Sequence, residues 1–298
     1  LLDIRAILNS TKKNVFFNLQ NVIKNMSVAC LFFLHKDNSL ANFNGTDNVN
    51  QKEIKNVISE IPKLKKNPRE LAESGFQRID TKDTTLILDC GVPKNYDATY
   101  KAHSCSTTFE LSYKKNKIII NSLSGLDEKI KKTTAAHSTL TLNNTNAYKI
   151  LQNEHLSRVP DKLKIKRVER YGANVIEIES YGYKNQYEAI HKRIIYIDKN
   201  GIDIRGEDNI YCPMDLSFDL RFYLDSKIKT LITNNEKNVV LKLPNGSGWK
   251  FVSSLNKLNL VLNRSLNTNK QPVRNEHIHL TGKTMELITI IKWSLKKY

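Results

Sequence analysis

The chain has 298 residues, of which 40% are hydrophobic and 26% charged, so it is long and apolar enough to form packed domains and is not intrinsically disordered. Its formal net charge of +17 attracts polyanions such as acidic polysaccharide, nucleic acid or anionic lipid. The longest apolar run, Val28 to Leu34, is too short to span a bilayer. The lysines are scattered and no zinc-finger or RRM signature is present, which argues against nucleic acid as the partner.

Residues 1–62 have the apolar spacing of helices. One stripe recurs at i, i+3, i+4 and i+7 from Val15 to Phe33, and a shorter stripe runs from Ile54 to Ile61. The polar stretch 37–45 separates the two stripes. We therefore predict a helical segment over residues 1–62 and a linker over residues 63–71.

From residue 72 onward the apolar period is two, as in strands. Phe109, Leu111 and Tyr113 share one face, while the residues between them share the other. Turn signals recur at short intervals, and no alternation of strands with long helices is present. The sequence therefore predicts a mainly β fold: a large antiparallel β-sandwich over residues 72–298, preceded by the short α-helical segment.

Three polar side chains stand at the ends of successive predicted strands. His103 and His137 each open an apolar run, and Asn121 closes another. Two imidazoles and an oxygen ligand from neighbouring strands are a common way for a β-scaffold to bind a metal ion. The alternative is that the two histidines only hydrogen-bond to each other across strands.

Five segments in fixed order resemble the C-terminal β-sheet domain of the heparinase II/III-like family, which comprises bacterial polysaccharide lyases and their relatives. The segments are Ser74-Gly75-Phe76, Leu86 to Gly91, His103 to Leu111, Ile118 to Ser122, and Ala135 to Asn144. In this family the sheet domain follows an α/α-toroid, so residues 1–62 resemble the last helices of that toroid. The resemblance implies that this chain is the C-terminal part of a longer protein, or a truncated relative.

The resemblance also implies a metal site. The family's His, Asp and His positions, which hold a zinc ion in some members, correspond to His103, Asn121 and His137. An asparagine oxygen is a poorer zinc ligand than a carboxylate, and it removes one negative charge that would offset the cation. A divalent metal such as zinc is therefore the cofactor that the resemblance implies, with one weakened ligand.

The implied reaction is β-elimination on a uronic-acid-containing glycan, which needs a base, a group that neutralises the carboxylate, and an acid. The family has a histidine where this chain has Lys101, and an aspartate where it has Cys105. Its catalytic tyrosine and its neutralising asparagine or histidine lie in the toroid. Tyr100, Lys101 and His103 are therefore the candidate catalytic residues, with Tyr100 a possible substitute for the toroid tyrosine.

A basic trio at residues 191–193 precedes an apolar run. His191 and Arg193 are candidate substrate-binding residues, because a guanidinium can bind a carboxylate or sulfate through two hydrogen bonds. The alternative is a solvated strand end. The four cysteines form no CxxC pair and are predicted to be buried thiols.

Two functions stay open. The chain is either part of a polysaccharide lyase for an acidic glycan or a non-catalytic, basic glycan-binding or cell-envelope module. His103 and His137 favour the first; Lys101, Cys105 and Asn121 favour the second. The family resemblance implies the periplasm or cell envelope, while the residues leave the cytoplasm and the oligomeric state open.

Overall fold

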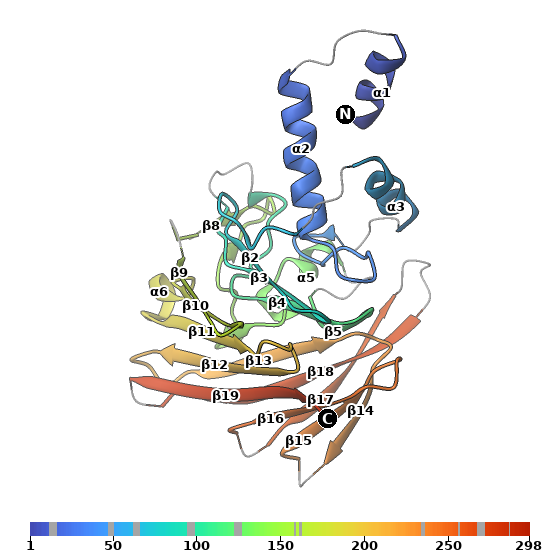
Figure 1. The fold of residues 1–298 in the computed structure, drawn as a ribbon. Coiled ribbons are helices and arrows are strands. Elements are labelled where there is room, and N and C mark those ends of the chain that lie inside the picture. Colours follow the sequence, from blue (N-terminus) through green and yellow to red (C-terminus); the bar gives the residue numbers. More distant parts are fainter. Residues whose placement is uncertain are drawn as a thin grey trace.

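The computed structural model of the chain describes residues 1–11, 17–46, 51–61, 66–93, 99–121, 127–157, 159–160, 163–233, 236–255, 257–266, 272–285 and 287–298. Residues 12–16, 47–50 and 62–65 of the predicted helical segment and linker therefore lie outside the described residues. The chain begins with three helices and continues as two large sheets (Figure 1). None of the described helices is long and apolar enough to cross a membrane.

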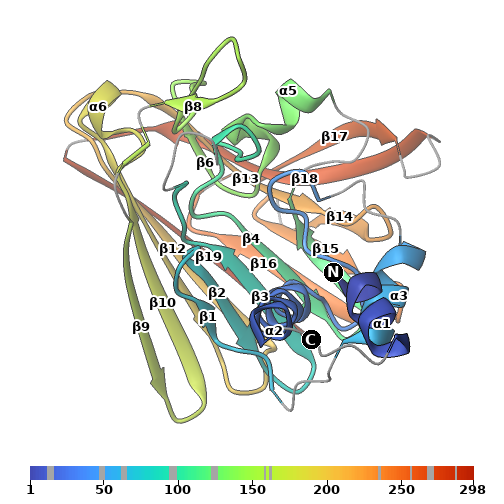
Figure 2. The same ribbon diagram turned by 90° about the horizontal axis from the view of Figure 1, so that it is seen from above.

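The helical segment consists of α1 (Leu2–Ser10), α2 (Phe17–Phe32) and α3 (Gln51–Glu60). Seen from above, α2 lies over β2 and β3 (Figure 2). Several of its apolar side chains are exposed, including Phe17 at 75%, Met26 at 57% and Val22 at 46%. The helical character of the first 62 residues is as predicted where the structure describes them, and the polar stretch 37–45 is a loop.

The first sheet has nine strands, all paired antiparallel, in the order β1-β2-β3-β4-β5-β13-β18-β17, with β6 also paired to β13. Their bounds are β1 Glu70–Leu71, β2 Phe76–Asp80, β3 Thr84–Asp89, β4 Phe109–Tyr113, β5 Asn116–Ile120, β6 Leu140–Leu142, β13 Ser217–Leu224, β17 Asn259–Leu266 and β18 Pro272–Lys283.

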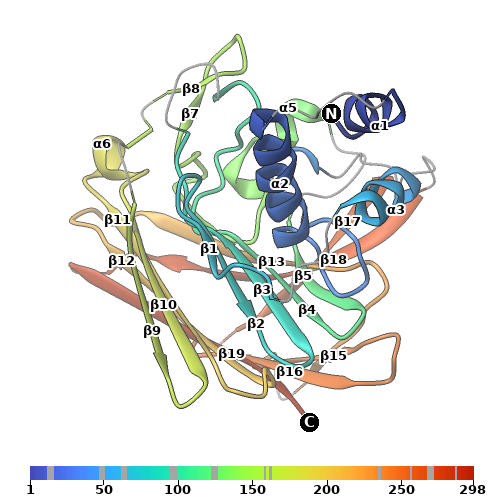
Figure 3. The ribbon, with the colours of Figure 1, turned by 45° about the horizontal axis from the view of Figure 1, so that its top comes forward.

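The second sheet has eight antiparallel strands in the order β14-β15-β16-β19-β12-β11-β10-β9. Their bounds are β9 Lys164–Arg170, β10 Ala173–Ser180, β11 Ile190–Ile197, β12 Asp203–Tyr211, β14 Lys229–Thr233, β15 Asn238–Lys242, β16 Gly248–Ser253 and β19 Ile288–Lys297. Strands β14 and β9 are the two terminal strands of this sheet, and β9 is seen at one side of the molecule (Figure 3). Smaller elements are α5 (Glu128–Lys131), a 3₁₀ turn (Thr134–Ala136), α6 (Lys184–Tyr187), β7 (Lys149–Ile150) and β8 (Leu156–Ser157).

The two sheets face each other across one apolar core, which confirms the predicted mainly β fold with a large antiparallel sandwich. Four aromatic side chains meet at its centre: Phe222 lies 4.9 Å from Trp293 and 5.1 Å from Phe251, and Phe109 stacks on Trp293 at 5.8 Å between ring centroids. Aromatic contacts of this kind stabilise a core beyond the area they bury. Gly206, directly opposite Trp293, leaves room for the indole, because a Cβ at residue 206 would overlap the ring.

A buried polar network attaches the helical segment to the outward face of the first sheet. Glu110 of β4 accepts hydrogen bonds from His35 Nε2 (2.9 Å) and from the backbone N–H of Asn42 (3.0 Å). Lys117 of β5 lies 3.5 Å from the same carboxylate. Burial alone would raise the pKa of Glu110, but Lys117 and His35 outweigh it and hold the pKa at about 2. This attachment places the loop after α2 next to the site described below.

Candidate functional site

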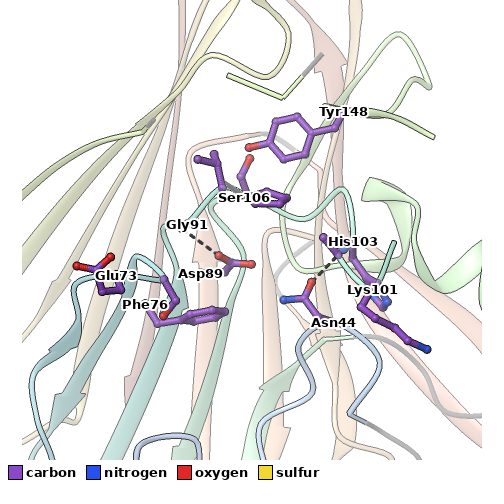
Figure 4. A pocket seen from close by; sticks show the side chains of 13 residues that line it. Asn44, Glu73, Phe76, Asp89, Gly91, Lys101, His103, Ser106 and Tyr148 are labelled. Carbon is purple, nitrogen blue, oxygen red and sulfur yellow. Dashed lines mark hydrogen bonds between the residues drawn. The ribbon is translucent and has the colours of Figure 1, made fainter. Parts of the chain in front are cut away.

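A cavity of about 350 Å³ opens where β3 ends and the loop before β4 begins (Figure 4). We call it the His103 pocket. Its lining comes from the loop after α2, from β2 and β3, and from the segments around residues 101–106 and 148: Asn44, Glu73, Ser74, Phe76, Asp89, Gly91, Val92, Pro93, Lys101, Ala102, His103, Ser106 and Tyr148.

The two predicted histidines meet at this pocket. His103 Nδ1 lies 3.2 Å from His137 Nε2, and the two side chains are almost fully buried. Neither residue lies in a strand: His103 belongs to the loop before β4, and His137 follows the 3₁₀ turn before β6. The two histidines thus lie within hydrogen-bonding distance, as the alternative to a metal site predicts, and loops and not strand ends position them.

The hydrogen bonds around this pair fix its tautomers. His137 Nδ1 lies 2.8 Å from the carbonyl oxygen of Thr133, and a carbonyl can only accept, so Nδ1 carries the proton. His137 Nε2 must then accept from His103 Nδ1, which leaves the lone pair of His103 on Nε2. Burial lowers the pKa of His103 to about 3 and that of His137 to about 4, so both imidazoles are neutral near pH 7.

The side-chain oxygen of Asn121, the third predicted metal ligand, is already occupied by hydrogen bonds within the fold. Its Oδ1 accepts hydrogen bonds from the Thr108 hydroxyl and from the backbone N–H of Ser138 (3.1 Å), the residue after His137. The remaining amide atom, Nδ2, is a donor and is not a metal ligand. Within the described part of the chain, no group of three or more His, Cys, Asp or Glu residues could hold a metal ion. The residues present do not fit a zinc site, and no step proposed below passes through a metal.

Of the three candidate catalytic residues, Lys101 and His103 line the pocket, whereas Tyr100 is not among its lining residues. Tyr100 is 43% exposed, and its ring contacts the ammonium groups of Lys132 (4.7 Å) and Lys101 (5.3 Å). The pocket therefore combines an exposed cation with a neutral imidazole.

The expectation that His191 and Arg193 bind substrate needs correction. Both are buried in the core, Arg193 with 0% exposure, and both bond Asp208 Oδ1 at 2.7 Å. Arg193 also donates to the carbonyl oxygens of Thr107 and Ser138, each at 2.8 Å. A polysaccharide in solvent does not reach a guanidinium enclosed in this way. The sequence pattern misled because alternate residues of β11 point inward, and the inward positions here carry polar side chains.

Sequence reasoning missed three pocket residues. Asp89 is buried, and its carboxylate accepts a hydrogen bond from the backbone N–H of Gly91 (3.0 Å) and one from the Cys105 thiol (3.3 Å). Burial raises the pKa of Asp89 to about 6. Asn44 Oδ1 accepts from the backbone N–H of His103 at 2.9 Å, and Tyr148 closes the far side (Figure 4). Asp89 stands inside the LILDCG segment, which was a usable signal; Asn44 is one of several asparagines in a polar loop and gave none.

Comparison with known proteins agrees with this fold. The heparinase II/III-like, C-terminal family matches residues 63–294, so the chain belongs to that family. A protein described as FtsZ-localized protein C, from Caulobacter vibrioides, is 22% identical over 253 residues, which are 78% of this chain and 44% of that protein.

Two solved structures show the same fold. The heparan sulfate lyase HepC of Pedobacter heparinus superposes with a TM-score of 0.71 at 16% identity, over 94% of this chain and 47% of HepC. The heparinase III that is the BT4657 gene product superposes with a TM-score of 0.68 at 14% identity, over 94% of this chain and 47% of that protein. The chain thus spans about half the length of the relatives that it matches.

Proposed function

We propose that this chain is the β-sandwich part of a polysaccharide lyase that cleaves a uronic-acid-containing glycan by β-elimination, and that the glycan binds at the His103 pocket. The observation that carries the proposal is that Lys101 and His103, whose Nε2 keeps its lone pair, both line this cavity. Lys101 would pair with the uronate carboxylate and favour loss of the neighbouring proton, because a cation stabilises the charge that develops there. His103 would accept a hydrogen bond from the sugar.

The same geometry argues that this chain alone does not turn over substrate. A general base works best when its pKa lies near the working pH. Burial lowers the pKa of His103 to about 3, so its imidazole is a poor acceptor for a carbon-bound proton. The base would therefore come from protein outside this chain, and the chain would supply binding and charge neutralisation.

The direct test follows the ultraviolet absorbance of the unsaturated uronate that β-elimination produces. The purified chain and the full-length gene product that contains it are each incubated with heparin, heparan sulfate and alginate. We expect product from the full-length protein only, and loss of that product in the Lys101→Gln variant but not in Lys66→Gln, an exposed lysine away from the pocket. Steady product from the chain alone that disappears in His103→Ala would show that it carries its own base, with Tyr100 and Lys101 the next residues to substitute.

The second candidate function is a non-catalytic glycan-binding or cell-envelope module. It is favoured by Lys101, Cys105 and Asn121 at the three positions where the family has acid–base or metal-binding groups. The Caulobacter vibrioides relative is also named for its localisation with FtsZ and not for a reaction. If the full-length protein binds these glycans but forms no product from any of them, this function replaces the first.

A further inference from the structure

The outward face of the second sheet carries an excess of cations. On β10, β11, β12 and β19 the inward residues are mostly buried and the alternate residues face solvent, and the register of the strand pairs extends this outward face to the other four strands. The helical segment packs on the outward face of the first sheet, so this face lies on the opposite side of the sandwich. Its basic residues are Lys164, Lys166, Arg170, Lys192, Arg205, Lys229, Lys242, Lys250, Lys292 and Lys296.

The carboxylates on the same face are already paired. Glu179 bonds Lys164, Glu177 bonds Lys192, Glu207 lies near Lys292, and Asp203 is shared by Arg205 and Lys296. Among the residues that the structure describes, the remaining cations Lys166, Arg170, Lys229, Lys242 and Lys250 have no carboxylate partner.

The register of the strands places like charges directly opposite each other. Lys229 faces Lys242 across β14 and β15, and Lys250 faces Lys296 across β16 and β19. Like charges in such positions destabilise strand pairing, so folding alone does not favour this arrangement. An anionic ligand laid across the strands would relieve the repulsion at both pairs.

A shallow groove of about 490 Å³ crosses this face next to the cations. Lys292, which is 67% exposed, and Arg205, which is 58% exposed, are part of its lining. Arg205 also lies over the ring of Tyr196, at 5.5 Å from the ring centroid. The rest of the lining consists of serine hydroxyls, one carboxylate, a glycine, two aliphatic side chains and the indole of Trp293, which is 3% exposed: Ser253, Ser254, Ser294, Glu207, Gly206, Val252, Ile194 and Trp293.

We propose that this face is a second binding site for an acidic polysaccharide, separate from the His103 pocket. The ligand class rests on the function proposed above, while the location rests on the cations and the groove. A ligand that carries both hydroxyl groups and anions matches a groove that offers hydroxyls, a carboxylate and flanking ammonium groups. Single-stranded nucleic acid fits less well, because it is bound on rows of exposed aromatic side chains, whereas the groove lining offers Tyr196 and the almost fully buried Trp293. A glycan held at two sites of one protein would also bind more tightly than at either alone.

The test compares two triple variants of equal charge. Arg205→Gln/Lys250→Gln/Lys292→Gln removes three cations from this face, and Lys24→Gln/Lys55→Gln/Lys66→Gln removes three exposed lysines elsewhere. Binding of a heparin-derived oligosaccharide to each is measured by calorimetry over a range of salt concentrations. We expect the first variant to weaken binding by about tenfold and to flatten its salt dependence, and the control to change binding by less than about threefold. Circular dichroism verifies that both variants fold.

Each result decides the proposal. Equal loss in the two triple variants would show that only net charge matters and would overturn it. If the first variant loses binding to a single-stranded DNA oligonucleotide but keeps binding to the oligosaccharide, the face binds nucleic acid and the proposal also fails. Lys101→Gln, measured in parallel, reports on the His103 pocket separately. If the first triple variant loses oligosaccharide binding and Lys101→Gln does not, the result supports this second site and removes support for the His103 pocket.

Discussion

Asp89 lines the His103 pocket, and among the described residues its carboxylate accepts hydrogen bonds from two donors, the Gly91 N–H and the Cys105 thiol. Few donors and deep burial favour the neutral acid, which is why the pKa of Asp89 is raised to about 6. A carboxyl with a raised pKa contributes stability at low pH and loses that contribution as the pH rises through the folded-state value. Above pH 6 the pocket therefore holds a poorly solvated charge.

We expect Asp89→Asn to stabilise the chain at pH 8, by about 1 to 3 kcal/mol, because the amide removes that charge. The gain should shrink toward pH 5, where Asp89 is already largely protonated. Urea unfolding at the two pH values measures it, with Asp215→Asn, an exposed carboxylate, as the matched control. A variant that is less stable than the native chain at pH 8 would contradict the raised pKa.

Asn121 offers a second test at the scale of one residue. Its Oδ1 is held by Ser138 and Thr108, and among the described residues its buried Nδ2 makes no hydrogen bond. Asn121→Asp keeps the oxygen that accepts from Ser138 and replaces the orphan donor by a carboxylate oxygen, the ligand type that the family resemblance implies at this position. We expect excess Zn²⁺ to raise the melting temperature of this variant by at least about 3 °C and that of the native chain by far less.

The zinc measurement is repeated after addition of EDTA, which should reverse the shift. His137→Ala in the Asn121→Asp background serves as the control for nonspecific zinc binding. An equal shift in the native chain and in Asn121→Asp would mean that the present residues already suffice for the metal.

At the scale of elements, the buried contacts of β4 decide where the helical segment lies. Glu110 accepts hydrogen bonds from His35 and Asn42 on the helical side and from the backbone N–H of Asn121 on the sheet side, at 2.9 to 3.0 Å. The apolar part of the same contact is the cluster of Phe32, Phe43 and Phe76. Alternation in β4 assigned Glu110 to the polar face of its strand, and the loop after α2 supplies the partners that bury it.

Glu110→Leu should release the helical segment. It leaves His35, the Asn42 N–H and the Asn121 N–H without their acceptor and Lys117 without its nearby carboxylate, which costs about 3 kcal/mol or more. Amide hydrogen exchange over residues 17–46 should accelerate by at least about tenfold, while β12 and β19 stay protected. Glu169→Leu removes an exposed pair with Arg69 and is the matched control. Unchanged exchange over residues 17–46 would mean that the aromatic cluster alone holds the segment.

For the whole molecule, burial keeps most histidines neutral. Of the seven histidines, six have a pKa lowered mainly by burial: His35, His103, His137, His191, His277 and His279. The unfolded chain takes up protons at these residues near pH 6.5, whereas the folded chain takes them up only at lower pH. Since the unfolded state then binds more protons, the free energy of unfolding must fall as the pH drops below 6.5.

We expect the free energy of unfolding to be at least about 2 kcal/mol lower at pH 5 than at pH 7.5, since each neutral buried histidine costs up to about 1.4 kcal/mol per pH unit. Asp89 and Asp225, whose pKa values are raised by burial, oppose the trend, but they are fewer than the six histidines. Urea titrations in 0.5 M NaCl measure the change, because this salt screens the repulsion of the +17 charge and leaves the buried histidines unaffected. Equal stability at the two pH values would refute the neutral-histidine assignment.

Local sequence determined the class of fold and two members of the site. The change from a helical to a two-residue apolar period shows which side chains each helix or strand must bury. This pattern can be recognised without knowing which other elements those side chains pack against. The two histidines, Lys101 and the five ordered segments were likewise visible in the sequence.

Tertiary structure decided what these residues face. Arg193 pairs with Asp208 in the core, and the side-chain oxygen of Asn121 accepts a hydrogen bond from the Ser138 N–H. Asp89 and Asn44 line the pocket together although they are 45 residues apart in the sequence. Burial and charge pairing arise from contacts between distant strands and loops, and they set pKa values and accessibility; a pattern of neighbouring residues therefore cannot determine them.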